Sequence, residues 1–344
     1  MSGWRKKERE LTIDEAMRLA KIEALPYWFN SPPLIGGVKM GNASSVYPLH
    51  DKFKQSPWLI YFLDVTDLNG EATIYHLKQW STRYSPFGLA SLIVLRLIYD
   101  QLKEPLVLKK WVERHQIPFP IAFDFDGTLA SAFGVEQFPA VVLCSQSSNG
   151  AVVHRASGEN WPQGYESHIQ TFLRSNDPGL ALTPVKVVEN HLPKDFSRLE
   201  FGKNRGTRFM TKEPLESELA TSVIAQGEWN QTADGVTTID QTATLSFMTE
   251  AGGFSFVGET LSKKNPELGK MIIELDGAAV IDAFASPDLT YDDTGQSAVY
   301  FKEFQLYHAV RGLKEGRKRF TLKFPNSKRV KVALYGVRLL KPAV

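Results

Sequence analysis

The stretch of sequence that decides the fold is Pro57-Trp-Leu-Ile-Tyr-Phe-Leu-Asp-Val-Thr-Asp-Leu-Asn-Gly70. Its apolar run from Trp58 to Leu63 is typical of a buried strand. A short polar loop follows, and an amphipathic helix is expected from Leu68 to Tyr84. A buried strand that leads through a tight loop into a helix predicts the first step of an alternating strand–helix fold.

The bulk composition excludes several classes of protein. The chain has 344 residues, a formal net charge of +2, 43% hydrophobic residues and one Cys. That length predicts about two domains. The near-neutral charge argues against a nucleic-acid partner, because nucleic-acid binders carry a strong basic excess. A single Cys excludes an internal disulfide and any metal site built from several cysteines, and we expect no cofactor.

Neither a membrane span nor a signal peptide is expected. The most apolar run, Gly88 to Tyr99, is interrupted by Ser91 and Arg96 and is too short to cross a bilayer. Residues 1–10 are basic but lack the apolar segment of a secretory signal that would follow them. The sequence therefore predicts a soluble chain, cytoplasmic by default.

Strands and helices alternate through the first half of the chain. A helix is expected from Leu11 to Leu25, where Thr12 and Glu15 form a capping box. The expected strands after it are Trp58–Leu63, one within Leu89–Tyr99, Pro120–Phe123, Pro139–Cys144 and Val152–Arg155. The expected helices are Leu68–Tyr84, Pro105–His115, Gly127–Gly134 and Tyr165–Arg174. This alternation predicts an α/β domain with a mostly parallel central sheet.

Turn-bounded apolar runs fill the second half. Asp276-Gly277 between two such runs is a strong hairpin signal. The expected strands are Thr242–Met248, Gly253–Gly258, Met271–Leu275, Ala278–Phe284, Ala298–Val310, Arg319–Phe324 and Val330–Leu340. They predict an all-β sandwich. The predicted domains are a helical extension (1–25), an α/β domain (26–176), a linker (177–190) and a β-sandwich (191–344).

Several motifs carry a resemblance to a known family. They are Trp28-Phe-Asn-Ser-Pro-Pro-Leu34, the spacing from Phe62 to Tyr84, Asp124 to Val135 followed by Phe138-Pro139, and Gly158-Glu159. On these motifs, residues 26–175 resemble the thioredoxin-like superfamily, specifically its TlpA/ResA-type proteins. The motifs Leu199 to Phe209, Gly227-Glu-Trp229, Leu275-Asp-Gly277 and Phe304 to Tyr307 resemble an appended sandwich. Such a sandwich, similar to a carbohydrate-binding module, follows this domain in the tail of DipZ-type proteins.

The resemblance implies a thioredoxin-like domain followed by a jelly-roll sandwich that binds carbohydrate or protein. It also locates the redox loop, where the family carries Cys-x-x-Cys. This chain has Asp67-Leu68-Asn69-Gly70 there, so Asp67 replaces the attacking Cys and Gly70 the resolving one. A carboxylate at a helix start accepts backbone N–H bonds and is favoured by the helix dipole, which predicts an N-cap. It cannot form a mixed disulfide, because exchange requires a thiolate.

The favoured function is therefore a redox-inactive binding or scaffolding role, not an enzyme. A cis peptide bond before Pro139 would leave neighbouring backbone open to pair with an extended protein or peptide partner. The predicted binding surface comprises Thr66, Asp67, Leu68, Asn69, Phe138, Pro139 and Trp161.

One alternative is a thiol-disulfide oxidoreductase or peroxidase that uses Cys144. Alternation along its strand places Cys144 with Ala140 and Val142 on one face, which favours a core position. A reactive thiol needs a helix N-terminus or a cationic neighbour, and the sequence shows neither beside Cys144.

A second alternative is a Mg²⁺-dependent phosphatase. Residues 121–129 look like the first motif of haloacid-dehalogenase-type phosphatases, with Asp124 as nucleophile and Asp126 as acid/base. The only acidic pair that follows, Asp292-Asp293, lies among turn residues of the β-rich half. The histidines show no metal-binding spacing, so no metal site is expected. Trp229 is a candidate to stack on a sugar ring, although a packing role is favoured.

Overall fold

The computed structural model describes residues 22, 25, 27–30, 38–39, 56–145, 151–158, 162–185, 195–203, 205–262 and 267–343. The helix expected over Leu11–Leu25 lies outside these residues except at Ile22 and Leu25. The chain divides into two compact units. The first contains Met1–Val65, Asn69–Ile98 and Leu108–Asn190, and the second contains Thr66–Leu68, Tyr99–Val107 and His191–Val344. The domain boundaries inferred from the sequence stay a prediction.

The first unit is built on a seven-stranded sheet of order β2-β1-β5-β4-β3-β6-β7. Its strands are β1 (Tyr27–Phe29), β2 (Val38–Lys39), β3 (Trp58–Asp64), β4 (Ala90–Arg96), β5 (Ile121–Asp124), β6 (Ala140–Cys144) and β7 (Val152–Ser157). The pairs β3–β4, β4–β5 and β1–β2 are parallel, whereas β1–β5, β3–β6 and β6–β7 are antiparallel. The prediction of a mostly parallel sheet was therefore wrong. Residues 145–151 between β6 and β7 are too few for a parallel crossover, so that pair must be antiparallel.

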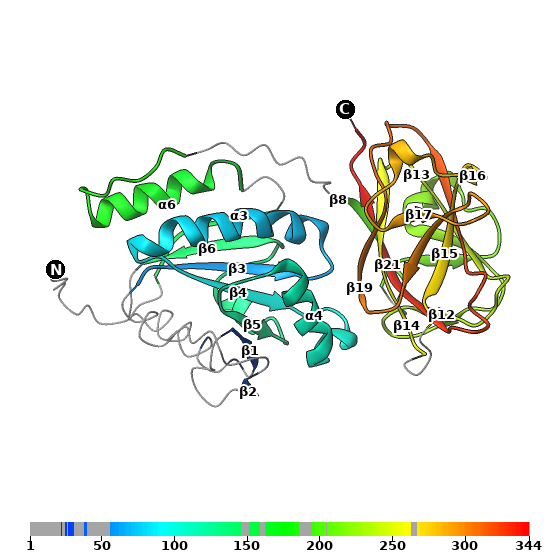
Figure 1. Cartoon of the computed structure of the whole chain (residues 1–344), viewed down its shortest axis with the longest axis horizontal. Coiled ribbons are helices and arrows are strands. Elements are labelled where there is room, and N and C mark those ends of the chain that lie inside the picture. Colours follow the sequence, from blue (N-terminus) through cyan, green and yellow to red (C-terminus); the bar gives the residue numbers. More distant parts are fainter. Residues whose placement is uncertain are drawn as a thin grey trace. The chain divides into compact units, whose positions relative to one another are not determined.

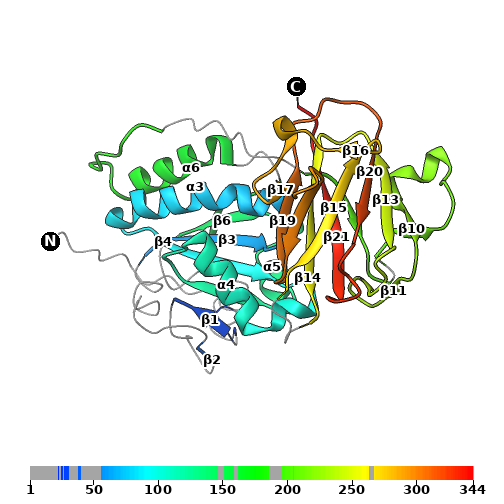
Figure 2. The same cartoon turned by 45° about the vertical axis from the view of Figure 1, so that its right-hand side comes forward.

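Four α-helices are described in this half of the chain: α3 (Leu68–Tyr84), α4 (Pro105–His115), α5 (Thr128–Ala132) and α6 (Pro162–Asn176). The bounds of α3 and α4 agree with those expected from the sequence. Helices α3 and α6 run side by side in both views (Figures 1 and 2). The Trp80 and Tyr165 rings stack with centroids 5.9 Å apart, and the Tyr84 hydroxyl donates to the buried Glu166 carboxylate at 2.6 Å. These contacts fix α3 against α6.

The core of the first unit follows the alternation along β3. Trp58, Ile60 and Phe62 lie in one buried cluster with Phe133 of the α5 end and Cys144 of β6. All seven residues of β3 are buried, as expected for a central strand covered on both faces. Because β3 is packed on both faces up to Asp64, it fixes the position at which the following loop begins.

Two sheets form most of the second unit, in which strands predominate in both views (Figures 1 and 2). One has the order β17-β18-β15-β20-β13-β10-β9 with β16 beside β15, and the other has the order β11-β12-β21-β14-β19 with β8 beside β21. Four strands of the second of these sheets are β8 (Asp195–Glu200), β14 (Gly253–Thr260), β19 (Gln305–Val310) and β21 (Val332–Leu340). One hydrophobic cluster takes residues from both sheets, among them Phe247 and Phe320 of the first and Phe254 and Val337 of the second.

The remaining strands are β9 (Arg208–Met210), β10 (Ser222–Gln226), β11 (Asn230–Gln231), β12 (Val236–Thr238), β13 (Thr244–Thr249), β15 (Gly269–Leu275), β16 (Ala278–Ala279), β17 (Leu289–Tyr291), β18 (Ser297–Phe301) and β20 (Lys318–Lys323). Asp276 and Gly277 adopt positive φ angles of 51° and 84° and connect β15 to β16, which confirms the hairpin. The strand expected over Ala278–Phe284 was wrong beyond Ala279, because Asp282–Phe284 forms a short 3-10 helix.

Candidate functional site

Asp67 lies at the N-cap position of α3. Strand β3 ends at Asp64 and the helix begins at Leu68, so Asp67 immediately precedes the first helical residue. Its side chain is fully buried. Its Oδ2 atom lies 2.9 Å from Nη2 of Arg198, a β8 residue of the same unit. The residue that precedes α3 is therefore a buried, ion-paired carboxylate.

A second arginine holds the neighbouring residue. Arg338 of β21 is 0% exposed. Its Nε donates to the Thr66 carbonyl at 2.9 Å, and its Nη2 donates to the Thr66 hydroxyl at 3.2 Å and to the Tyr99 hydroxyl at 3.1 Å. Its Nη1 lies 2.8 Å from Glu200, which pairs its charge. Burial raises the pKa of Tyr99, Arg338 lowers it and Glu200 raises it, so the hydroxyl stays protonated and donates to Glu200.

Much of the predicted binding surface is buried. Thr66, Asp67 and Leu68 are 1%, 0% and 3% exposed, so their side chains offer a partner no open face. Asn69 is also buried, and Gly70 is buried within α3. The Asp67 carboxylate is paired with Arg198 within the chain.

Sequence reasoning missed the two arginines of this network. Arg198 and Arg338 lie directly opposite each other on β8 and β21. The strand expected over Val330–Leu340 contained one signal, because Arg338 interrupts an otherwise apolar run. Its partners belong to distant segments, and no local pattern connects them.

Phe138 and Pro139 lie at the start of β6, and the peptide bond between them is cis. Pro139 is buried and Phe138 is half-buried. The exposed guanidinium of Arg96, the last residue of β4, lies 5.0 Å from the centre of the Phe138 ring. Trp161, the remaining member of the predicted surface, lies outside the described residues. Phe138 is therefore the part of that surface that the structure leaves accessible.

Cys144 is a buried core residue far from the loop. It is 0% exposed and lies in the cluster that contains Ala140 and Val142, as the alternation predicts. In the antiparallel pairing of β6 with β3, Cys144 lies opposite Trp58. The loop follows the other end of β3 at Asp64, about 20 Å away at the usual rise per strand residue. Cys144 is therefore unable to act together with the residues of that loop.

The two aspartates of the phosphatase-like motif serve the backbone. Asp124 is buried, and its two oxygens accept the Leu129 N–H at 3.1 Å and the Ala130 N–H at 2.8 Å. Burial raises the pKa of Asp124, and these N–H bonds oppose the shift. Asp126 accepts the Thr128 N–H at 3.0 Å, which lowers its pKa. Both carboxylates act as caps at the start of α5.

This chain is similar in part to several solved structures. No family model and no curated protein matches it. Solved structures similar to it include a thioredoxin-like protein in the oxidized form, with 19% identity over 45% of this chain and 95% of that one and a TM-score of 0.35. A secreted Mycobacterium tuberculosis disulfide oxidoreductase homologous to E. coli DsbE has 12% identity over 36% and 85%, with a TM-score of 0.29. An uncharacterized thioredoxin-like protein from Porphyromonas gingivalis has 20% identity over 35% and 74%, with a TM-score of 0.28.

The first unit is an α/β domain with a mixed seven-stranded sheet, and the second unit is rich in β-strands. Among the described residues, no helix is long and apolar enough to cross a membrane. Within the same part of the chain, no group of three or more His, Cys, Asp or Glu side chains is placed to hold a metal ion.

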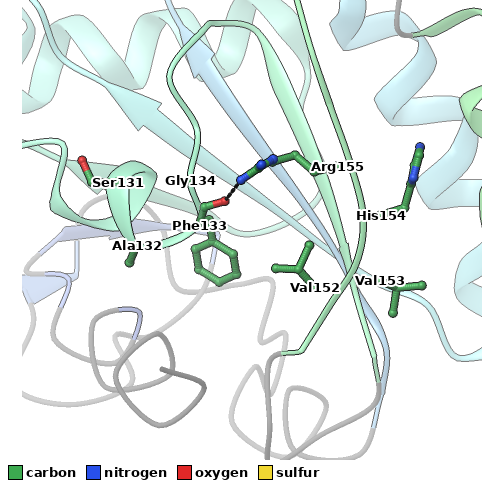
Figure 3. Close-up of a pocket in the computed structure, with 8 residues that line it drawn as sticks. All are labelled: Ser131, Ala132, Phe133, Gly134, Val152, Val153, His154 and Arg155. Atoms are coloured by element: carbon green, nitrogen blue, oxygen red, sulfur yellow. Dashed lines mark hydrogen bonds between the residues drawn. The ribbon is translucent and has the colours of Figure 1, made fainter. Parts of the chain in front are cut away.

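A cavity of about 590 Å³ lies between α5 and β7 (Figure 3). Arg155 reaches across it, and its Nη1 donates to the Phe133 carbonyl at the end of α5 at 2.8 Å. Arginines commonly bind the last carbonyls of a helix in this way. Gly134 has a φ of 62°, and a Cβ atom there would lie 2.1 Å from Arg155 Nη1. The glycine therefore gives the arginine room to cap the helix, which is a structural role.

Trp229 is half-buried and packs edge-to-face on Phe324, with ring centroids 5.4 Å apart. Its indole N–H donates to the Gln226 carbonyl at 3.0 Å. The Trp229 side chain therefore has the packing role that was favoured over stacking on a sugar ring. Carbohydrate binding by this unit stays a prediction.

Proposed function

We propose that this protein is a redox-inactive, thioredoxin-like binding protein, with residues 191–344 forming an appended β-sandwich of jelly-roll type. The observation that carries the proposal is the state of Asp67. It occupies the loop position of the attacking thiol, is fully buried and is paired with Arg198 at 2.9 Å. A group in that state provides structural stability and offers no nucleophile to a disulfide.

The only thiol of the chain does not replace the missing chemistry. Exchange needs a thiolate that a second sulfur can approach, and Cys144 is 0% exposed at the far end of β3 from the loop. With one Cys there is also no resolving thiol within the molecule. The proposal therefore assigns Cys144 to the core.

The proposed binding surface is now centred on Phe138. Gln137 is exposed, and within the described part of the chain the backbone groups of Gln137 and Phe138 have no hydrogen-bond partner. Unpaired backbone at the edge of a structured segment is what an extended peptide uses for strand addition. A protein partner that presents such a segment fits this surface.

Two measurements test the two halves of the proposal. Reduction of insulin disulfides by dithiothreitol, followed by turbidity, should proceed at the rate of the buffer alone when the protein is added. Selection of random octapeptides on the full-length chain should enrich binders, and hydrogen exchange should show new protection of residues 134–140 in their presence. Acceleration of insulin reduction would refute the redox-inactive half. An unenriched library, or protection confined to other segments, would refute the binding half.

A further inference from the structure

Three parallel strands of the first unit end in one row of charged residues. Asp64 of β3 lies opposite Arg96 of β4, and Arg96 lies opposite Asp124 of β5. Residues in register on neighbouring strands project from the same face of the sheet. Asp64 and Asp124 are 5% and 2% exposed, whereas Arg96 is exposed. Only the cation of this row therefore meets the solvent.

Within the described residues, the Arg96 guanidinium contacts an aromatic ring and forms no ion pair. It lies 5.0 Å from the centre of the Phe138 ring, within the range of a cation–π contact. No ion pair of Arg96 occurs among the residues that the structure describes. The neighbouring Asp124 carboxylate is occupied by the Leu129 and Ala130 N–H groups. Stacking on a ring face leaves the N–H edge of a guanidinium available for bidentate binding of a carboxylate.

We infer that the partner segment bound beside Phe138 is acidic, and that Arg96 selects it by pairing with an Asp or Glu side chain. This inference rests on the proposed function and specifies the chemistry of its partner. An extended segment paired with the backbone at Gln137 and Phe138 projects alternate side chains toward one face. The ring that orients Arg96 belongs to Phe138, so the cation lies beside the same segment.

Two exposed carboxylates nearby in the chain could favour a partner segment of the opposite charge. Asp126 and Glu136 are both exposed and would attract a basic segment instead. Asp126 is engaged by the Thr128 N–H, which lowers its pKa, and within the described part of the chain no hydrogen bond or ion pair orients the Glu136 side chain. Arg96 is held by its aromatic contact, and an oriented group loses less conformational entropy on binding. The acidic segment is therefore favoured.

The experiment is the octapeptide selection at 0.15 M salt, run in parallel on the full-length protein and three variants. Arg96→Gln removes the charge, Arg96→Lys keeps the charge without the planar fork, and Arg174→Gln removes an equally exposed arginine at the end of α6. The wild type and Arg174→Gln should enrich Asp or Glu at one fixed position, and Arg96→Gln should not. The selected peptide should bind Arg96→Gln about tenfold more weakly, which corresponds to about 1.4 kcal/mol. Arg96→Lys should give an intermediate affinity.

The outcomes separate this inference from the function on which it rests. Peptides enriched without an acidic position, or with a basic one, would overturn the inference while binding itself stands. An acidic preference that survives Arg96→Gln would also overturn it. Failure to enrich any peptide on the wild type would overturn the proposed function. Equal thermal midpoints of all four proteins would show that the differences do not come from unfolding.

Discussion

Cys144 should be almost inert toward thiol reagents in the native protein. The side chain is 0% exposed and β6 is hydrogen-bonded on both sides, to β3 and β7. A reagent reaches the sulfur only after β6 separates from a neighbouring strand, which amounts to unfolding most of the sheet. For a domain, that opening costs at least about 5 kcal/mol, so labelling should be slower than that of a small thiol by a factor of about 10³ to 10⁴.

The assay is the release of thionitrobenzoate from 5,5′-dithiobis(2-nitrobenzoate) at pH 8. Native protein should release almost none over minutes, and protein in 8 M urea should release one equivalent at once. Ser157→Cys supplies the matched control, because Ser157 is an exposed residue of the neighbouring strand β7. That variant should show one fast equivalent and one slow equivalent. Rapid reaction of Cys144 in the native wild type would refute its assignment to the core and would support the alternative of a thiol enzyme that uses Cys144.

The other predictions concern stability. Arg338→Met should lower the free energy of unfolding by about 3–5 kcal/mol, because it removes the hydrogen bonds of a fully buried guanidinium to Thr66 and Tyr99 and leaves the half-buried Glu200 carboxylate without its cation. Arg311→Met at an exposed position should change it by less than about 0.5 kcal/mol, and urea titration measures both. Burial lowers the pKa of His76 below its ordinary value of 6.5, so the folded state favours the neutral imidazole. The stability that neutral His76 contributes is fully present above pH 6.5 and is lost as the pH falls below it. The urea midpoints at pH 7.5 and 5.0 should therefore differ less in His76→Phe than in the wild type. Gly134→Ala should cost about 2 kcal/mol from its positive φ and its clash with Arg155, and less in an Arg155→Ala background, as a double-mutant cycle would show.

Local signals in the sequence were enough to locate the elements around the loop. The apolar run at Trp58, the polar loop and the proline at 105 gave β3, α3 and α4 bounds that agree with the structure to within one residue. The prediction of a mostly parallel sheet was wrong because the alternation of strands and helices does not reveal that β6 runs antiparallel to β3. That pairing depends on which way the chain re-enters the sheet, and no local residue pattern records it.

The missed parts of the β-rich unit have a similar cause. Strands such as β9 and β11 have three and two residues, too few for an alternating pattern. In the run after the hairpin, Val280 is buried but Ile281 is 59% exposed, so its apolar sequence did not correspond to a strand. The residues of the predicted binding surface were chosen by their position in the loop, and the sequence did not reveal that Arg198 and Arg338 contact Asp67 and Thr66 there.

The start of α3 favours a negatively charged side chain at Asp67. A helix N-terminus stabilises a nearby negative charge, whether thiolate or carboxylate. A thiolate uses that stabilisation to remain reactive, and it must also be accessible to a second sulfur. Asp67 gains the same stabilisation at the start of α3, and its pairing with Arg198 adds a further constraint that accessibility would forbid. Under the proposed function, Asp67 therefore stabilises this loop and supplies no thiolate for disulfide exchange.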